Sequence, residues 1–329
     1  MSLRKVSEED YIKFMIGSPR QYSCCEAERV SAKLPHTPSH DSWNRLLTNI
    51  EPDSGKLWAE AKPYVEKDNG ILVLDDSTLD KPYSQKNQLV SHHWSGKHQK
   101  VVKGINLVSL VWSNEEYCIP CDYRIYQKEN GMTKNDHFKS MLNEANQRGM
   151  RPEYMLFDSW YASLENLKLV RDLGWRWVTR LQGNRTVNPD SSGQIALSEM
   201  EIDQDGSIAY LKGYGLVKVF RIVAKDGDAE YWASNDHSLT DLQRLKLADQ
   251  AWSIENYHRD LKQNTGVERC QLRSVVGQKN HIGFSIRAFF RMEIYRLRKG
   301  ISRFTTKWNI IRDAVAHFMA VPFLWHSTT

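Results

Sequence analysis

The sequence has few cysteines, no long apolar run and little net charge. It contains 5 cysteines among 329 residues, an odd number that does not suit a disulfide framework. No segment approaches the roughly 20 apolar residues that span a bilayer, and the first residues, MSLRKVSEEDYIKF, lack the apolar stretch of a signal peptide. Lysine and arginine outnumber aspartate and glutamate by 45 to 40. We therefore expect a globular cytoplasmic protein with reduced thiols and no membrane segment, whose charge permits a polyanionic partner without requiring one.

The cysteines and histidines do not follow the spacing of a metal motif. Cys118 and Cys121 have CxxC spacing, but they lie in the run YCIPCDYRIY, which is typical of a strand, and Cys24 and Cys25 are adjacent. The three histidines of HHWSGKH, residues 92–98, lack the helical HExxH spacing. We interpret these residues as packing or surface residues, not as a zinc or redox site.

Hydrophobic patterning predicts an α/β protein in five regions. Apolar runs alternate with capped helical segments in the middle of the chain, in the order three strands, helix, strand, helix, strand. That order favours a ribonuclease-H-like mixed sheet flanked by helices, interrupted by a β-rich insertion, with a helical N-terminal region and a helical C-terminal region. The predicted regions are 1–69 (helical N-terminal region), 70–181 (first part of the core), 182–230 (β-strand insertion), 231–300 (second part of the core) and 301–329 (C-terminal helical region).

Three acids lie where a metal site can form. Asp76, with Asp75 beside it, is expected to close the first buried strand, Asp158 to close the fourth, and Glu255 to lie in a helix, in AWSIENYHRDLK. Strands that end at one sheet edge bring their terminal side chains together, and a helix across that edge adds a third carboxylate. Mg²⁺ prefers such oxygen ligands. Taken singly, each acid also fits a turn former or a solvated helix residue.

Basic residues near these acids are candidates for DNA contact. Glu255, Arg259 and Lys262 fall near one helix face, which suits either a polyanion-binding surface or an ordinary intrahelical ion pair. Lys97 and Lys100 belong to a basic, histidine-rich segment before the second strand, which suits either phosphate contacts or a solvated loop.

Four segments together resemble DDE transposases of the IS4/IS701 group of bacterial insertion sequences: LVLDDSTLDKPYS, HHWSGKHQKVVKGINLVSLVW, FDSWYAS and WSIENYHRDLKQNTGVER. The resemblance extends over about residues 39–297. The first two acids are 158 − 76 = 82 residues apart and the second pair 255 − 158 = 97, and the longer gap is where that group carries its β-strand insertion.

The group's signature around the glutamate is Tyr-x2-Arg-x3-Glu-x6-Lys. Glu255 and Lys262 match its second half, while Ala248 and Ala251 occupy its Tyr and Arg positions. The first acid of the group precedes a Ser/Thr pair, as Asp76 does here. We therefore favour Asp76 as the first catalytic acid and keep Asp75 as the alternative.

The resemblance implies a transposase that cleaves DNA at the ends of a mobile element and joins them to target DNA. For residues 1–69 it implies DNA end binding or dimer contacts. It implies that Asp76, Asp158 and Glu255 hold Mg²⁺, with Mn²⁺ as a substitute, and that Lys262 contacts DNA. The implied partners are the terminal inverted repeats and target DNA, bound by a homodimer in the bacterial cytoplasm, at the nucleoid. The alternative is a domesticated, non-catalytic DNA-binding protein of the same fold, and a metal-independent glycoside hydrolase is a second rival.

Overall fold

The computed structural model describes residues 6–20, 22–32, 37–95, 100–191, 193–223 and 227–320. The chain forms two compact units. Unit 1 comprises Met1–Glu60, Thr78–Ile105 and Tyr257–Thr329, and unit 2 comprises Ala61–Ser77 and Asn106–Asn256. Strands β1 and β3 and helix α7 each contribute residues to both units.

Unit 2 is a mixed α/β unit, as the sequence predicts. Its helices are α5 (Lys134–Gln147), α6 (Leu164–Asp172) and the first part of α7 (Asp241–Asn264). Its strands are β1 (Ile71–Asp80) and β3 (Lys100–Ser113) in part, β4 (Cys118–Tyr126), β5 (Tyr154–Phe157), β6 (Trp177–Leu181), β7 (Thr186–Asn188), β8 (Ile195–Ala196), β9 (Ser207–Leu211), β10 (Gly215–Val223) and β11 (Ala229–Ser234).

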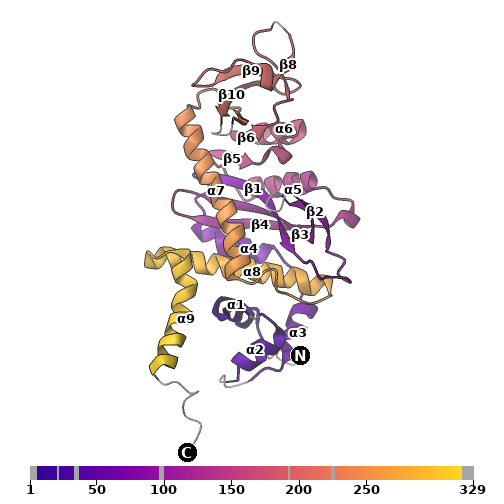
Figure 1. Cartoon of the computed structure of the whole chain (residues 1–329), viewed down its shortest axis with the longest axis vertical. Helices are drawn as coiled ribbons and strands as arrows, with labels where there is room; N and C mark the ends of the chain where they lie inside the picture. Colours follow the sequence, from indigo (N-terminus) through magenta and orange to yellow (C-terminus); the bar gives the residue numbers. More distant parts are fainter. Residues whose placement is uncertain are drawn as a thin grey trace, which may run out of the picture. The chain divides into compact units, whose positions relative to one another are not determined.

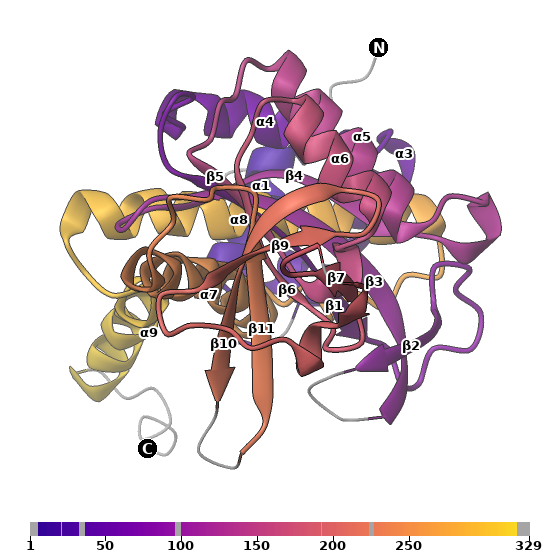
Figure 2. The same ribbon diagram turned by 90° about the horizontal axis from the view of Figure 1, so that it is seen from above.

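The strands of unit 2 form one mixed sheet, in the order β4-β3-β1-β5-β6-β11-β10-β9-β7-β8. Strands β1, β5 and β6 are parallel, whereas β11 pairs antiparallel with β6. The strands within the predicted insertion, residues 182–230, therefore extend the main sheet, and Figure 2 shows β10 side by side with β11, the strand that follows the insertion. The helices α5 and α6, also adjacent in Figure 2, contact each other.

The central strands form where the sequence is apolar on both faces. All four residues from Ile71 to Leu74 and all four of β5 are buried, which suits parallel strands covered on both sides. Helix α5 begins with the predicted capping box of Thr133 and Asp136. Strands β1 and β5 pair in parallel from Ile71 and Tyr154 to Leu74 and Phe157.

The expectation that Asp76 closes the first strand was wrong, because strand β1 continues to Asp80. Residues 91–95 of the basic, histidine-rich segment form strand β2 (Ser91–Ser95). Both features depend on β3, because β2 pairs antiparallel with the start of β3 and the Lys81 amide, directly after β1, donates to the Lys103 carbonyl. A Cβ added at Gly104 of β3 would lie 2.5 Å from the Leu79 carbonyl oxygen, so only glycine allows β1 and β3 to approach this closely.

Unit 1 is mainly helical, with β2 and the adjoining ends of β1 and β3. Its helices are α1 (Glu8–Gly17), α2 (Cys24–Val30), α3 (His40–Asn49), most of α4 (Gly55–Ala61), the end of α7, α8 (Val275–Lys299) and α9 (Arg303–Ala320). Helices α1 and α3 pack against the long helix α8, and α9 follows it (Figure 1). Aromatic residues fill the contact, among them Tyr11, Trp43 and Phe284.

Two polar side chains of unit 1, His281 and Arg287, have defined partners. His281 lies between the Tyr11 hydroxyl, 2.9 Å from Nδ1, and the Gly266 carbonyl, 3.0 Å from Nε2. Arg287 binds Glu8 and Glu60 at 2.7 and 2.6 Å. Within the described residues, no helix has both the length and the hydropathy needed to cross a bilayer.

Candidate active site

The register of β1 and β5 brings two acids to the same height of the sheet. The last paired residues are Leu74 and Phe157, so Asp75 and Asp158 are the next residues on two neighbouring parallel strands. Residues opposite each other in parallel strands point to the same face, and successive residues of one strand alternate. Asp75 therefore shares a face with Asp158, and Asp76 points to the other.

The Asp75 carboxyl lies in a field of negative charge. Its pKa is raised well above its usual value, first because burial disfavours the ionised form and then because the carboxylates of Asp76, Glu255 and Asp158 repel its charge. Helix α7 supplies Glu255, and its packing is fixed by Cys118 of β4, whose Sγ contacts the Ser253 carbonyl at 3.5 Å. Glu255 is itself exposed. Asp75 therefore interacts electrostatically with both Asp158 and Glu255, the other two acids predicted for the site.

The Asp76 carboxylate, in contrast, is fully engaged by donors. Its Oδ2 accepts from Asn106 Nδ2 at 2.6 Å and Lys134 Nζ at 2.7 Å, and its Oδ1 accepts from the Tyr161 hydroxyl at 2.7 Å. The charge of Lys134 and these hydrogen bonds outweigh the cost of burial and lower the pKa of Asp76. Three elements, β3, α5 and the 3₁₀ turn η3 (Ser159–Tyr161), therefore meet at this one side chain.

Asp158 is held by an arginine and by its own turn. As the N-cap of η3 it accepts the Ser159 amide at 2.6 Å, and Arg180 Nη2 lies 3.2 Å from the same Oδ1. Arg180 also binds Glu230 at 2.9 Å, and its Cζ lies 5.9 Å from the centre of the Trp232 ring. Asp158 therefore shares its cation with a second acid.

The predicted basic residues lie in unit 1. Lys262 donates to the Thr78 carbonyl at 2.8 Å and lies 3.8 Å from Glu268, while Arg259 is exposed. Lys100 is exposed at the start of β3, and Lys97 lies outside the described residues. On α7, Ile254, His258 and Leu261 are buried.

Other candidate groups do not form a site. Cys118 and Cys121 are buried on β4, and burial raises the pKa of the Cys121 thiol to about 12, which leaves it protonated. In the described part of the chain, no three histidine, cysteine or acidic side chains already converge as a metal cage.

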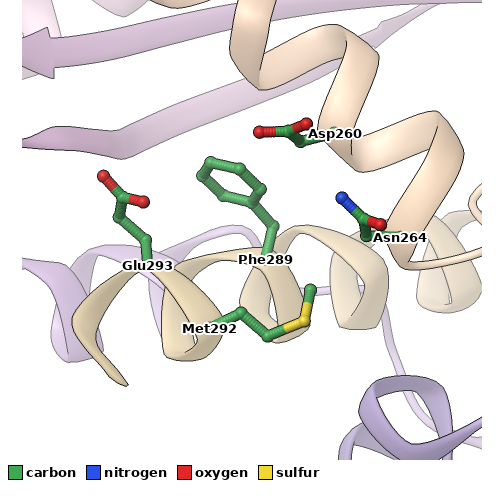
Figure 3. A pocket seen from close by; sticks show the side chains of 5 residues that line it. All are labelled: Asp260, Asn264, Phe289, Met292 and Glu293. Atoms are coloured by element: carbon green, nitrogen blue, oxygen red, sulfur yellow. The ribbon is translucent and has the colours of Figure 1, made fainter. Parts of the chain in front are cut away.

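A small pocket between α7 and α8 in unit 1 also contains acids. Figure 3 shows Asp260 and Asn264 on α7 and Phe289 and Glu293 on α8. Its volume of about 10 Å³ holds at most one water molecule, and Arg296 neutralises Glu293 at 2.8 Å. The pocket is therefore part of the packing between the two helices.

Sequence reasoning missed the residues that surround the acids. Lys134, Asn106 and Tyr161 were not singled out, because each lies 30 or more residues from Asp76 and joins it only through the fold. Arg180, which binds Asp158, was not among the predicted site residues either. The aromatic residues beside Asp158 were the one available signal, since Tyr161 proves to be a partner of Asp76.

Comparison with known proteins identifies the family and the fold of the chain. The family model of the DDE superfamily endonucleases matches residues 27–198, a segment that contains Asp75, Asp76 and Asp158 and ends before Glu255. Among solved structures, the chain is similar to a piggyBac transposase in a synaptic complex with hairpin DNA, determined by cryo-EM. The TM-score is 0.55 and the identity 12%, over 98% of this chain and 72% of that one. No curated protein matches the sequence.

These similarities confirm the predicted ribonuclease-H-like fold and the DDE character of the chain. The narrower resemblance to the IS4/IS701 group stays a prediction. Because the family model covers more than half of the sequence, and the acids it includes lie at one height of a mixed sheet, the chain belongs to the DDE superfamily endonucleases.

Proposed function

We propose that this protein is a transposase, which cuts DNA at the ends of a mobile element in a metal-dependent reaction and transfers the ends to target DNA. The observation that carries the proposal is the register Leu74–Phe157, which aligns Asp75 with Asp158 on the face where Glu255 also acts on Asp75. A cluster of carboxylates on adjacent parallel strands has no use in packing, because its charges repel one another.

For the first acid we propose Asp75, the alternative kept from the sequence, in place of Asp76. Asp76 fits the Ser/Thr rule of the resemblance, but its two carboxylate oxygens already bind Asn106, Lys134 and Tyr161. A metal ion there would compete with the Lys134 ammonium. Asp76 then serves as a positioning residue that fixes β1 against α5 and η3.

The residues fit a divalent cation. Asp75, Asp158 and Glu255 offer only carboxylate oxygens, the ligands that Mg²⁺ and Mn²⁺ prefer, and repulsion from neighbouring carboxylates, which contributes to the raised pKa of Asp75, would be relieved by a cation. When bound, such ions would activate an attacking oxygen and stabilise the leaving one. Without a cation, Arg180 forms an ion pair with Asp158. When Asp158 binds a cation, Arg180 would keep its other ion pair, with Glu230.

DNA is the proposed substrate and partner. The similar piggyBac structure was solved with hairpin DNA. We propose that Lys262, Arg259, Lys97 and Lys100 contact the phosphates of the terminal repeats or the target. Two element ends in one reaction favour a homodimer on DNA, at the nucleoid of a bacterial cell, as in the IS4/IS701 group.

Cleavage of supercoiled plasmid DNA carrying the sequences that flank the gene tests this proposal. With Mg²⁺ or Mn²⁺ we expect nicks or breaks at both flanks, and none with EDTA. A protein that binds these flanks but never cuts them with either ion is the domesticated DNA-binding protein of the alternative. Hydrolysis of a glycoside in the presence of EDTA would instead support the second rival.

A further inference from the structure

Unit 1 contains a cleft that is separate from the acids. It has a volume of about 610 Å³ and lies between the loop 80–86, which follows β1, and the segment 268–273, which follows α7. This volume is in the range of ligand-binding pockets, roughly 300–1,000 Å³. No residue of the proposed catalytic set lines it.

The walls of the cleft are held together by hydrogen bonds. Lys81 is buried and donates to the carbonyls of Glu268 and Cys270, both at 2.8 Å. The Asp80 amide donates to the Glu268 carboxylate at 3.0 Å, and Gln278 donates to the carbonyls of Cys270 and Leu272 at 3.1 and 2.7 Å. These bonds join two segments that are about 190 residues apart in the chain, so the cleft is a built feature and not a gap between loose loops.

The cleft has cations without acidic partners. Lys86, Arg269 and Arg273 are exposed on its lining, and within the described residues none of their side chains forms an ion pair or a hydrogen bond. Elsewhere in unit 1 the arginines of α8 bind carboxylates, as Arg287 does with Glu8 and Glu60. The lining also contains two acids, Asp80 and Glu268, and Glu268 is engaged by Lys262 and the Asp80 amide.

An aromatic ring completes the lining. Tyr83 is 95% exposed, so its ring contributes almost nothing to the core. An exposed aromatic ring among unpaired cations is the combination with which proteins bind a single nucleic-acid strand, because the ring stacks on a base and the cations contact phosphates. A base inside a duplex is already stacked on both faces and does not offer this contact.

We propose that this cleft binds an unpaired segment of DNA strand, with its phosphates at Lys86, Arg269 and Arg273 and one base stacked on Tyr83. The identity of the polymer as DNA rests on the proposed function. The site itself rests on the cleft, its unpaired cations and the exposed ring.

The test measures fluorescence anisotropy of a labelled oligothymidylate and of a duplex, with the full-length protein in EDTA so that no cleavage occurs. Lys86→Ala/Arg269→Ala/Arg273→Ala should weaken single-strand binding and reduce the slope of log K against log [salt] by about 2, from three contacts at roughly 0.7 each. Arg45→Ala/Lys299→Ala/Arg312→Ala removes the same charge from exposed positions of unit 1 outside the cleft and should leave the slope unchanged. Equal losses in both triple variants would overturn the proposal, and so would a loss confined to the duplex.

Tyr83 separates stacking from charge. Tyr83→Ala should weaken single-strand binding by about 5- to 150-fold with an unchanged salt slope, and Tyr83→Phe should bind like the wild type. An unchanged affinity of Tyr83→Ala would overturn the stacked base.

The two proposals fail separately. If the wild type cuts DNA but the cleft variant binds a single strand as the wild type does, the cleft proposal is wrong and the transposase proposal stands. If the wild type never cuts but the cleft variant loses single-strand binding, the cleft proposal stands and the catalytic one is wrong.

Discussion

Two neighbouring aspartates on opposite faces of β1, Asp76 and Asp75, have opposite electrostatic surroundings. On one face, Asp76 receives three hydrogen bonds from β3, α5 and η3, and its pKa is lowered. On the other, Asp75 lies near two further acids, Asp158 and Glu255, and its pKa is raised. Hydrogen-bond donors around a carboxylate stabilise its charge, whereas neighbouring carboxylates that repel it cost stability, and such clusters of acids are frequent at functional sites.

The cations of unit 1 show the same contrast. Arg287 and Arg291 share Glu60 at 2.6 and 3.1 Å, and this network joins α4 to α8. Arg269 and Arg273 lie in the same unit without any acidic partner in the described residues. The paired arginines contribute to packing, and the unpaired ones favour an anionic ligand.

The largest expected effect concerns the acids Asp75 and Asp158. Asp75→Asn and Asp158→Asn should each lower DNA cleavage by on the order of 10³-fold or more, because an amide is a poor Mg²⁺ ligand and the ions supply several kcal/mol of charge stabilisation. Single-turnover cleavage, beside a gel shift in Ca²⁺, measures this, and DNA binding should survive. The control is Asp172→Asn on the exposed surface of α6. Wild-type cleavage by Asp75→Asn, with inactive Asp76→Asn, would reverse the assignment of the two faces.

Substitution of Asp76 should affect mainly the stability of the fold. Asp76→Asn should lower the free energy of unfolding by about 1.5–3 kcal/mol, since it removes charged hydrogen bonds at a partly buried side chain. It should slow cleavage by only about 10- to 100-fold, the effect of residues that orient a ligand. Urea unfolding of Asp76→Asn, Lys134→Met and the double variant measures the coupling. Losses that simply add would show that the pair does not act as a unit.

The buried histidine of unit 1, His281, should make the stability of the protein depend on pH. Burial lowers the pKa of His281 to about 3 from 6.5. Between these values the unfolded chain binds a proton that the folded chain does not, so stability should fall as the pH drops below about 6.5, by roughly 1.4 kcal/mol per pH unit. His281→Gln should flatten this dependence in urea unfolding between pH 6.5 and about 4, and His317→Gln, on the exposed face of α9, should not. The same slope in His281→Gln would place the acid sensitivity elsewhere.

The smallest expected effect concerns a cation that is already engaged. Lys262→Ala should weaken binding of a DNA duplex and reduce the salt slope by about 1, the equivalent of one phosphate contact. The hydrogen bond from Lys262 to the Thr78 carbonyl limits the effect, because DNA must replace it. Salt titrations of Lys262→Ala beside Arg45→Ala measure the difference. Identical slopes would assign Lys262 to the structure of unit 1 alone.

The sequence predicted the central strands well, because the runs 71–74 and 154–157 are apolar throughout and buried strands need little else. It did not predict that β1 continues to Asp80, since acidic and hydroxyl residues are weak strand formers and β3 holds them in place. The choice between Asp75 and Asp76 depends on strand direction and register, which no local pattern contains.

The residues that surround the acids could not be predicted from local sequence patterns either, because only the folded chain brings them together. Lys134 has the sequence context of an ordinary first helical residue, and only the packing of α5 brings its ammonium to Asp76. The cleft combines the loop 80–86 with residues 268–273, which are neighbours only in the folded chain. Chemistry-bearing residues were thus visible in the sequence, but their pairing was not.

The length of the β-rich insertion has a consequence during protein synthesis. Glu255 follows Asp158 by 97 residues, so a ribosome adding about 5–20 residues per second leaves an interval of roughly 5–20 s in which β1 and β5 exist without α7. A nascent chain, or a product truncated in the insertion, then has both aspartates but lacks the last acid. If the protein has the proposed nuclease activity, the order of the acids along the chain delays that activity until translation is nearly complete, and truncated products are expected to be inert toward the DNA of their own gene.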